Sequence, residues 1–390
     1  MSTSGEVLVV GPGFRFFGGL SVYTCRLVGA LVERRPVSLI TLDRLIPARL
    51  YPGGARVGQD LGSLEIDPRV RRLGTVDWYW FPTLFTTLAR LVRHRPSVMV
   101  LQWWTAATLH TYLVLALVAK VLRVPVVLEF HETQDTGEAG VPGVAAYAST
   151  VMPLLMRLAR GGLVHNEHDL ALLRETYGSG IDRLEIEIAP HGPYDHLGAA
   201  PAADEARVAS ASDGVTRVLC FGLIRPYKGT EDAIAALDAM TDEEAADFRL
   251  TIVGETWEQW TLPAERIAKS RHRDRIEFVN RYVTDEEAAA FHADADVVLL
   301  PYRRGSSSGP LHIAMSHGLH VILYGVGGLV EAVAEYAGAV VVEPDDVDAL
   351  RAALLEVRAV KDQRFTDPHS WDRTCDAVAR LEHKVIAGAR

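Results

Sequence analysis

Short apolar runs alternate with segments of helical periodicity along most of the chain. In the first half, the runs that predict strands are Glu6–Val10, Val37–Leu42, Ser97–Leu101, Pro125–Phe130, Leu163–His165 and Glu185–Ala189. Segments such as Leu20–Val32 and Thr105–Leu122 lie between them and have the pattern of packed helices. Strands that alternate with helices are typical of a parallel, doubly wound sheet, so the pattern predicts an α/β fold.

The pattern breaks between Gly198 and Gly214, where Ala, Ser and Asp replace the periodic apolar residues, as in a linker. The second half restarts the alternation, with predicted strands at Arg217–Phe221, Phe248–Val253, Arg275–Val279, Asp296–Leu300, Val321–Leu323 and Ala339–Val342. A chain of 390 residues is also longer than most single cores. We therefore expect two Rossmann-like domains, residues 1–197 and 198–370, facing each other across a ligand cleft, followed by a terminal helix.

Composition narrows the choice of partners and compartment. The formal net charge of -10 disfavours nucleic acid as a partner, because nucleic-acid binding needs a basic surface. Cys25, Cys220 and Cys375 lack metal-ligand spacing and are interpreted as reduced thiols. The first residues have no secretory pattern, so we expect a cytoplasmic protein. Peripheral contact with the inner face of the membrane stays open, although Arg and Lys in the first half look too scattered to mark a lipid-binding helix.

The strongest candidate site follows the predicted strand Arg217–Phe221. Gly222 ends the strand, and the loop after it carries Arg225 and Lys228 before a helical pattern begins. Open α/β sheets bind phosphorylated ligands at the carboxyl ends of their strands and at helix N-termini. Arg binds phosphate oxygens with a fork of donors and Lys adds a point charge, so the loop predicts a phosphate site. Two solvated surface cations are the alternative.

A second candidate lies just before another predicted helix. Ser306, Ser307, Ser308 and Gly309 precede Pro310, which favours the first turn of a helix. Backbone N–H groups and the helix dipole at such a position suit a diphosphate. An ordinary helix N-cap is the alternative, since Ser is a preferred cap.

Three further features lie after predicted strands. Gly18 and Gly19 would let backbone N–H groups approach a ligand. His131 follows the strand Pro125–Phe130, where it would face the cleft and either hydrogen-bond a substrate hydroxyl or stabilise developing charge; a buried structural His is the alternative. A glycine-rich loop opens the helix that contains Glu331, and this Glu could also cap the helix.

Several of these motifs resemble those of one enzyme family. The matching segments are Gly222 to Gly229 with Arg225 and Lys228, Phe278 to Val283 followed by Asp285 to Glu287, Gly327 to Glu331, Pro344 to Asp346, and Pro190 to Gly192. Together they resemble the retaining glycosyltransferases of family four, also called glycosyl transferases group 1. The resemblance implies the GT-B fold, in which two Rossmann-like domains face each other across a cleft.

The resemblance implies transfer of a sugar from a nucleotide-diphosphate donor to an acceptor, with retention at the anomeric carbon. It makes residues 1–197 the acceptor-binding domain, with the helix at 371–390 packing back on it, and residues 198–370 the donor-binding domain. The acceptor is a small molecule, a glycan or a lipid.

The resemblance also implies roles for single residues. Arg225 and Lys228 would hold the diphosphate without a metal or other cofactor, and His131 would lie beside the donor sugar. Gly18 and Gly19 would lie near the diphosphate or the acceptor. For the remaining donor site, the resemblance implies contributions from Gly222, Arg281, Tyr282, Ser306, Ser307, Ser308, Gly309 and Glu331.

One departure from the family pattern affects the donor site. The family motif E-x7-E would place its second carboxylate at Ile313 and its first near Gly305, or at Ser306 to Ser308 if a residue is deleted; none of these positions holds a carboxylate. In the family the second Glu binds the ribose hydroxyls and the first contacts the donor sugar. A non-catalytic nucleotide-sugar-binding or partner subunit of GT-B fold is therefore the alternative function.

Overall fold

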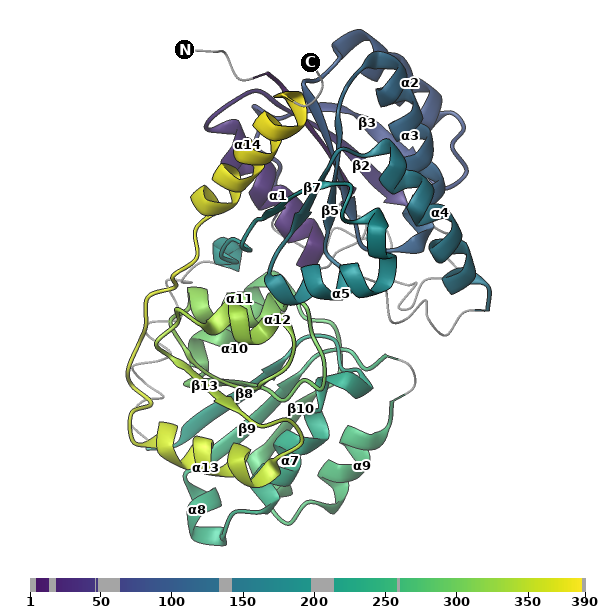
Figure 1. Cartoon of the computed structure of the whole chain (residues 1–390). Coiled ribbons are helices and arrows are strands. Elements are labelled where there is room, and N and C mark those ends of the chain that lie inside the picture. Colours follow the sequence, from purple (N-terminus) through teal and green to yellow (C-terminus); the bar gives the residue numbers. More distant parts are fainter. Residues whose placement is uncertain are drawn as a thin grey trace. The chain divides into compact units, whose positions relative to one another are not determined.

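The computed structural model of the protein (Figure 1) describes residues 5–13, 19–45, 47, 64–132, 142–197, 214–257 and 260–387. The chain forms two compact units. Unit 1 comprises Met1–Gly192 and His369–Arg390, and unit 2 comprises Pro193–Pro368. The linker expected at 198–214 lies outside the described residues except for Gly214. The units divide slightly before it, because Tyr194 is buried and its ring lies 5.9 Å from that of His312 in unit 2.

Unit 1 contains a sheet of seven parallel strands in the order β3-β2-β1-β4-β5-β6-β7. These are β1 (Val7–Pro12), β2 (Val37–Arg44), β3 (Arg71–Asp77), β4 (Val98–Trp103), β5 (Val126–Phe130), β6 (Gly161–Val164) and β7 (Glu185–Ile188). Every residue of β1, β4 and β5 is buried, as expected of central parallel strands covered on both faces.

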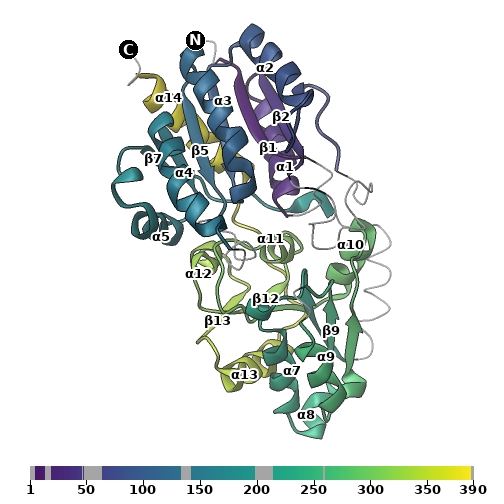
Figure 2. The same ribbon diagram turned by 90° about the vertical axis from the view of Figure 1, so that its right-hand side faces the viewer.

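The helices of unit 1 cover both faces of this sheet. They are α1 (Gly19–Val32), α2 (Thr83–His94), α3 (Leu109–Leu122), α4 (Val144–Leu158), α5 (Glu167–Tyr177) and α14 (Trp371–Ala387). Figures 1 and 2 show α2, α3 and α4 on one face, and α1 and α14 on the other. A large apolar core fills the space between the first layer and the strands, with Leu91, Trp103 and Tyr112 among its buried members.

The terminal helix α14 packs against α1, β6 and β7. Arg35 and Glu382 form a largely buried ion pair between the end of α1 and α14. Thr374 Oγ1 also donates to the backbone oxygen of Pro190 at 2.6 Å. The last helix is therefore an integral layer of unit 1, although more than a hundred residues of unit 2 separate it from β7.

Strand β3 is absent from the sequence-based expectations. Its residues read Arg-Arg-Leu-Gly-Thr-Val-Asp, so the strand has no continuous apolar run, and it lies at the edge of the sheet. An edge strand needs only a partial apolar pattern, and that pattern is easily read as a loop.

Unit 2 contains six parallel strands in the order β10-β9-β8-β11-β12-β13. The strands are β8 (Thr216–Phe221), β9 (Phe248–Val253), β10 (Ile276–Val279), β11 (Val297–Leu300), β12 (His320–Tyr324) and β13 (Ala339–Val342). The helices are α7 (Thr230–Asp238), α8 (Asp242–Ala246), α9 (Leu262–Lys269), α10 (Asp285–Asp294), α11 (Gly309–Ser316), α12 (Gly328–Val333) and α13 (Val347–Arg358). One apolar core involves α7 and α13, and another involves α10, α11 and α12. Together with unit 1, these layers confirm the predicted pair of doubly wound α/β sheets.

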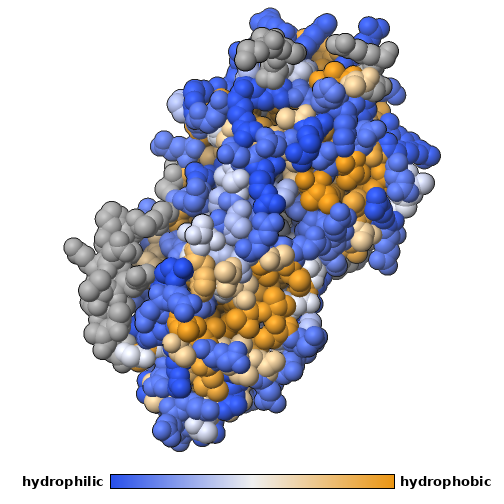
Figure 3. Space-filling view, turned by 60° about the vertical axis from the view of Figure 1, so that its left-hand side comes forward, coloured by the Kyte–Doolittle hydropathy of each residue, from blue (hydrophilic) through white to orange (hydrophobic). Residues whose placement is uncertain are grey.

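Hydrophilic residues dominate the face shown in Figure 3, where hydrophobic residues gather in separate patches. Cys25, Cys220 and Cys375 are all buried and free, and burial raises the pKa of the Cys220 thiol to about 12. These thiols are therefore unreactive near neutral pH. Among the described residues, no helix combines the length and the apolar character needed to cross a membrane.

Candidate functional site

The strand order reverses once in each sheet. The reversal lies between β1 and β4 in unit 1, and between β8 and β11 in unit 2. At such a switch point the connections diverge to opposite faces and leave a crevice outside the carboxyl ends of the strands. In unit 2, Arg225 and Lys228 follow β8, and the serines at 306–308 follow β11. The topology thus brings the two sequence-predicted phosphate-binding segments to one place.

The loop after β8 depends on two glycines. Gly222 has a φ of 108° and Gly229 a φ of 60°, which residues with a side chain rarely adopt. A Cβ at Gly229 would lie 2.0 Å from the backbone oxygen of Pro301, and a Cβ at Gly222 would lie 3.2 Å from Pro310 Cγ. The loop therefore packs tightly against the end of β11 and the first turn of α11.

Arg225 and Lys228 lie over aromatic rings. Lys228 Nζ is 3.7 Å from the ring centre of Tyr302 and 5.3 Å from that of Tyr227. Arg225 Cζ is 5.6 Å from the ring centre of Tyr227 and 5.9 Å from that of Trp257. A ring face attracts a cation without cancelling its net charge. The rings therefore position two positive charges at the carboxyl end of β8.

Two further arginines follow β11 and differ in their surroundings. Arg303 forms ion pairs with three carboxylates, those of Glu231 at 2.7 Å and of Asp232 and Asp345 at 2.9 Å. Arg304 Cζ instead lies 5.0 Å from the ring centre of Tyr227. Arg303 is therefore a structural cation that joins the end of β11 to the first turn of α7 and to the loop before α13, whereas Arg304 adds a third positive charge beside Tyr227. Sequence reasoning did not single out Arg304.

Helix α11 begins beside this cluster. Its N-cap is Ser308, whose Oγ accepts a hydrogen bond from the backbone N–H of Leu311 at 3.3 Å. The Ser308 hydroxyl is thus used by the helix, while Ser306 is half-buried and Ser307 is exposed. The first N–H groups of the helix and its dipole favour an anion at this end. The side chains that line a pocket at the carboxyl end of β8 include Phe221, Leu223, Lys228, Thr230 and Tyr302.

The glycine-rich loop before α12 packs against the loop before α11. The N–H of Gly328 donates to the backbone oxygen of Gly305 at 3.1 Å, and a Cβ at Gly305 would lie 3.3 Å from Leu329. Gly327 has a φ of 54°. Glu331 lies in α12 with an exposed side chain. This loop therefore supports the segment that carries Ser306 and Ser307.

Arg281 and Tyr282 follow β10, two strands away from β8 in the sheet. Arg281 Nη2 lies 2.6 Å from Glu287 Oε1, and Glu287 also forms a capping box with Thr284 at the start of α10. The hydrogen bonds from Arg281 and from the Thr284 backbone lower the pKa of Glu287 to about 2. Arg281 therefore orders the start of α10, and Tyr282 beside it is half-buried.

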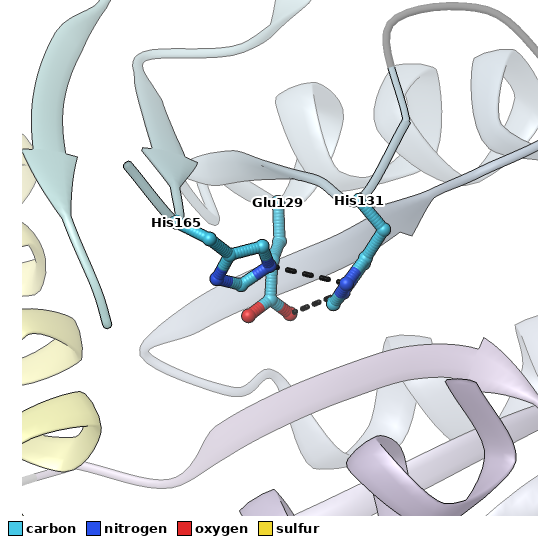
Figure 4. A group of neighbouring side chains, drawn as sticks. All are labelled: Glu129, His131 and His165. Atoms are coloured by element: carbon cyan, nitrogen blue, oxygen red, sulfur yellow. Dashed lines mark hydrogen bonds and ion pairs between the residues drawn. The ribbon is translucent and has the colours of Figure 1, made fainter. Parts of the chain in front are cut away.

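In unit 1, the carboxyl end of β5 carries a buried group of Glu129, His131 and His165 (Figure 4). The Glu129 carboxylate accepts hydrogen bonds from the Tyr23 hydroxyl at 2.6 Å and from Gln102 Nε2 at 2.9 Å. His131 Nε2 lies 3.6 Å from Glu129 Oε2, and His131 Nδ1 lies 3.1 Å from His165 Nε2. Side chains from α1, β4, β5 and the end of β6 thus form one polar network.

The partners of this network indicate where its protons lie. His165 Nδ1 is 2.9 Å from the backbone oxygen of Ala189, which only accepts, so Nδ1 carries the proton and Nε2 is an acceptor. His131 therefore donates from Nδ1, and its Nε2 faces the Glu129 carboxylate. Burial lowers the pKa of His131, and Glu129 opposes this shift. Burial would raise the pKa of Glu129, but His131, His165 and Tyr23 together lower it to about 2.

The same three side chains offer ligand atoms that lie within 4.8 Å of one another, as in a metal site. Each of them already takes part in the network, and Tyr23 and Gln102 engage both oxygens of Glu129. A metal ion would have to displace several of these hydrogen bonds. The arrangement therefore fits a proton-holding network better than a metal centre.

The sequence-predicted residues of unit 1 have different environments. His131 is only 6% exposed, and Gly19 is exposed at the start of α1. Gly18 lies outside the described residues. Sequence reasoning missed Tyr23, Gln102 and His165. Of these, His165 directly follows β6, so the rule that selected His131 could have found it.

Comparisons with known proteins give the chain a family. The profile described as "Glycosyl transferases group 1" matches residues 215–359, and that of the "Glycosyl transferase 4-like domain" matches residues 18–192. The chain belongs to the group 1 glycosyltransferases. The catalytic domain of starch synthase IV from Arabidopsis thaliana, solved with ADP and acarbose, matches with a TM-score of 0.71 at 13% identity. This match covers 99% of this chain and 100% of that one and shows the GT-B fold.

Two relatives belong to different transferase types. A GDP-mannose:glycolipid 4-beta-D-mannosyltransferase of Xanthomonas campestris pv. campestris is 37% identical over 102 residues, which is 26% of this chain and only 28% of that protein. A 2-deoxystreptamine glucosyltransferase of Streptomyces kanamyceticus is 24% identical over 325 residues, which is 79% of this chain and 82% of that protein.

The two positions at which the resemblance implies a carboxylate, Gly305 and Ile313, carry no charge in this group 1 glycosyltransferase. Gly305 lies in the loop before α11, and Ile313 lies within α11 with a buried side chain. Neither side chain can donate or accept a hydrogen bond.

Proposed function

We propose that the protein is a retaining glycosyltransferase that moves a sugar from a nucleotide-diphosphate donor to an acceptor without a metal. The observation that carries the proposal is the grouping of Arg225, Lys228 and the N-terminus of α11 at the switch point of unit 2. Departure of a diphosphate develops negative charge. Fixed cations and oriented N–H groups stabilise such charge most strongly where water is excluded.

Each group has a separate part in holding the diphosphate. Lys228 supplies a point charge, Arg225 supplies a fork of N–H donors, and Arg304 adds charge from the other loop. The aromatic rings hold these cations in place, so little reorganisation is needed when the donor binds. The N–H groups around Ser307 and Gly309 complete the site, and Gly222 has no side chain that would block the ligand.

The other predicted donor residues have supporting roles in this proposal. His131 lies beside the donor sugar, with its ring orientation set by Glu129 and His165. Gly19 approaches the diphosphate or the acceptor through its N–H group, and the same role is proposed for Gly18, which lies outside the described residues. Arg281, Tyr282 and Glu331 contribute to the outer donor site, where Arg281 acts through its pairing with Glu287.

The acceptor belongs to one of three classes: a small molecule, a glycan or a lipid. The named relatives act on a glycolipid and on 2-deoxystreptamine, so family membership leaves the classes open. The metal-free part of the proposal rests on the cations that the chain itself supplies. Transfer is therefore expected to continue in EDTA, and loss of activity that Mg²⁺ restores would contradict it.

A thermal-shift screen with UDP-, GDP- and ADP-sugars tests the proposal. A donor present at about 100 times its Kd should stabilise the native state by about 2.7 kcal/mol and raise Tm. The donor so identified is then incubated with candidate acceptors, and NMR of the product gives the anomeric configuration. No binding by any nucleotide sugar, or an inverted product, would contradict the proposal.

A non-catalytic nucleotide-sugar-binding or partner subunit is the second candidate. The observation that favours it is the absence of a carboxylate at Gly305 and Ile313. Donor binding with neither transfer to any acceptor class nor slow donor hydrolysis would favour this candidate over the enzyme.

A further inference from the structure

The layer of α2, α3 and α4, which faces the viewer in Figure 2, exposes large apolar side chains. Nine of the thirteen large hydrophobic residues that are exposed in the described part of the chain lie between residues 78 and 154. Each helix carries a pair of them: Phe85 and Val92 on α2, Leu117 and Val121 on α3, and Tyr147 and Leu154 on α4. Spacings of four or seven place each pair on one helix face. Since α3 packs against both α2 and α4, the three pairs belong to one apolar layer.

The same layer is basic and lacks acidic residues. No Asp or Glu occurs in residues 78–128 or 139–166. The last turns of the three helices carry Arg93, Lys120 and Arg157. All three helices connect parallel strands and therefore run in the same direction, so these cations lie at the same end of the layer. The chain as a whole has a net charge of -10. The fold nevertheless brings these three cations, which are far apart in the sequence, to one end of the layer.

Helix stability alone does not account for this composition. A helix dipole favours cations in the last turn, but it equally favours acids in the first turn. In unit 2, helices α7, α8, α10 and α13 carry Asp or Glu in their first turns. Helices α2, α3 and α4 have no acidic residue in their first turns. The exclusion of acids from this layer therefore points to a negatively charged partner.

We propose that the outer face of α2, α3 and α4 docks on a bilayer surface that contains anionic lipids. Exposed apolar side chains enter the headgroup boundary, and the basic ends of the helices lie against lipid phosphates. A second copy of the chain would present the same positive charge, which disfavours pairing between two such faces. This docking does not depend on the proposed transfer reaction and can be measured without a donor.

Vesicle flotation of the full chain tests the docking. The wild type is expected to float with vesicles of phosphatidylcholine containing phosphatidylglycerol, but not with pure phosphatidylcholine, and to dissociate as salt rises. Each basic residue at an anionic surface strengthens binding by about fivefold. The double variant Arg93→Glu/Lys120→Glu should therefore bind at least about 25-fold more weakly. The variant Phe85→Ser/Val121→Ser should lose at least about tenfold through its apolar contacts.

The matched control is Arg266→Glu/Lys269→Glu, which changes the charge equally in the last turn of α9 in unit 2. This control should float like the wild type. The proposal would be overturned if the wild type did not float with anionic vesicles, or if the control lost as much vesicle binding as Arg93→Glu/Lys120→Glu. It would also be overturned if sedimentation showed a wild-type dimer that becomes a monomer in the Arg93→Glu/Lys120→Glu variant. The last result would assign the face to a second copy of the chain.

Discussion

The carboxyl ends of the two sheets use charge in different ways. In unit 1, the Glu129 carboxylate is fully buried and hydrogen-bonded to Tyr23 and Gln102, with His131 beside it. In unit 2, Arg225 and Lys228 lie over aromatic faces next to the start of a helix. The first group stabilises a buried charge with hydrogen bonds, whereas the second gathers two cations over aromatic rings at the carboxyl end of β8.

This difference separates stability from catalysis. Loss of one member of a buried hydrogen-bonded network destabilises the fold, because the polar groups that it contacted are left unsatisfied. Cations that stabilise developing charge act mainly on the reaction barrier. Substitutions at Glu129 and its hydrogen-bond partners should therefore change the free energy of unfolding, and substitutions at Arg225 and Lys228 should change turnover.

The largest stability effect is expected from Glu129→Gln. The substitution keeps the shape but removes the charge that the Tyr23 hydroxyl and the Gln102 amide stabilise, and it turns an amide donor toward one of these two donors. Each hydrogen bond to a charged group contributes about 1.5–3 kcal/mol, so disturbing both should cost up to about 3–6 kcal/mol. Urea unfolding measures the loss, and Tyr23→Phe should cost less, about 1.5–3 kcal/mol, because only one hydrogen bond to the carboxylate is lost. Equal stability of Glu129→Gln and the wild type would show that the network is not structural.

In unit 2, Lys228→Ala and Arg225→Ala should each lower turnover by about 10²–10³, the usual effect of removing one group that stabilises developing charge. Their free energies of unfolding should stay within about 0.5 kcal/mol of the wild type. Arg303→Ala is the contrasting variant, since its ion pairs join three segments and its loss should lower stability. Wild-type turnover in folded Lys228→Ala would remove this residue from the site.

Acid should destabilise unit 2 through His292. Burial, the largest cause, lowers the pKa of this fully buried residue to about 3, so the unfolded chain binds a proton at higher pH than the native state does. The stability from neutral His292 is present above pH 6.5 and is lost as the pH falls toward 3. At pH 5 the loss is about 2 kcal/mol. Urea unfolding at pH 7 and pH 5 should show this difference in the wild type but not in His292→Gln; the same pH dependence in both would contradict the assignment.

The smallest expected effect concerns the ribose of the donor. Ile313 stands where the resemblance implies a carboxylate for the ribose hydroxyls, and its buried side chain offers no hydrogen bond. A ribo and a 2′-deoxy nucleoside diphosphate should therefore differ by less than about tenfold in Kd, or 1.4 kcal/mol. A larger preference for the ribo form would mean that another residue has taken over this contact.

Most of the fold follows from local patterns. The central strands are continuous apolar runs, and Gly222, Ser308 and Pro310 mark turns and a helix start through their own backbone chemistry. Strand β3 was not predicted, because Arg71 and Arg72 interrupt the apolar pattern of this edge strand.

The candidate site was only partly readable. Arg225 and Lys228 are close in sequence, and their position after a strand indicates their chemistry. Tyr23 and Gln102 meet Glu129 only because three separate elements converge, which no local spacing reveals. Part of the surroundings of Arg281 could be predicted, because Thr284 and its partner Glu287 have the spacing of a capping box.

The central claim is that the cations of unit 2 hold the donor's diphosphate. Isothermal titration in EDTA with UDP, GDP and ADP tests it directly, by comparing the wild type with Lys228→Ala and the surface control Lys269→Ala. We predict that at least one nucleoside diphosphate binds the wild type and the control equally, and binds Lys228→Ala at least about tenfold more weakly, as expected for loss of a charged hydrogen-bonding group. Equal affinity of Lys228→Ala and the wild type, or binding that requires a divalent metal, would contradict the claim.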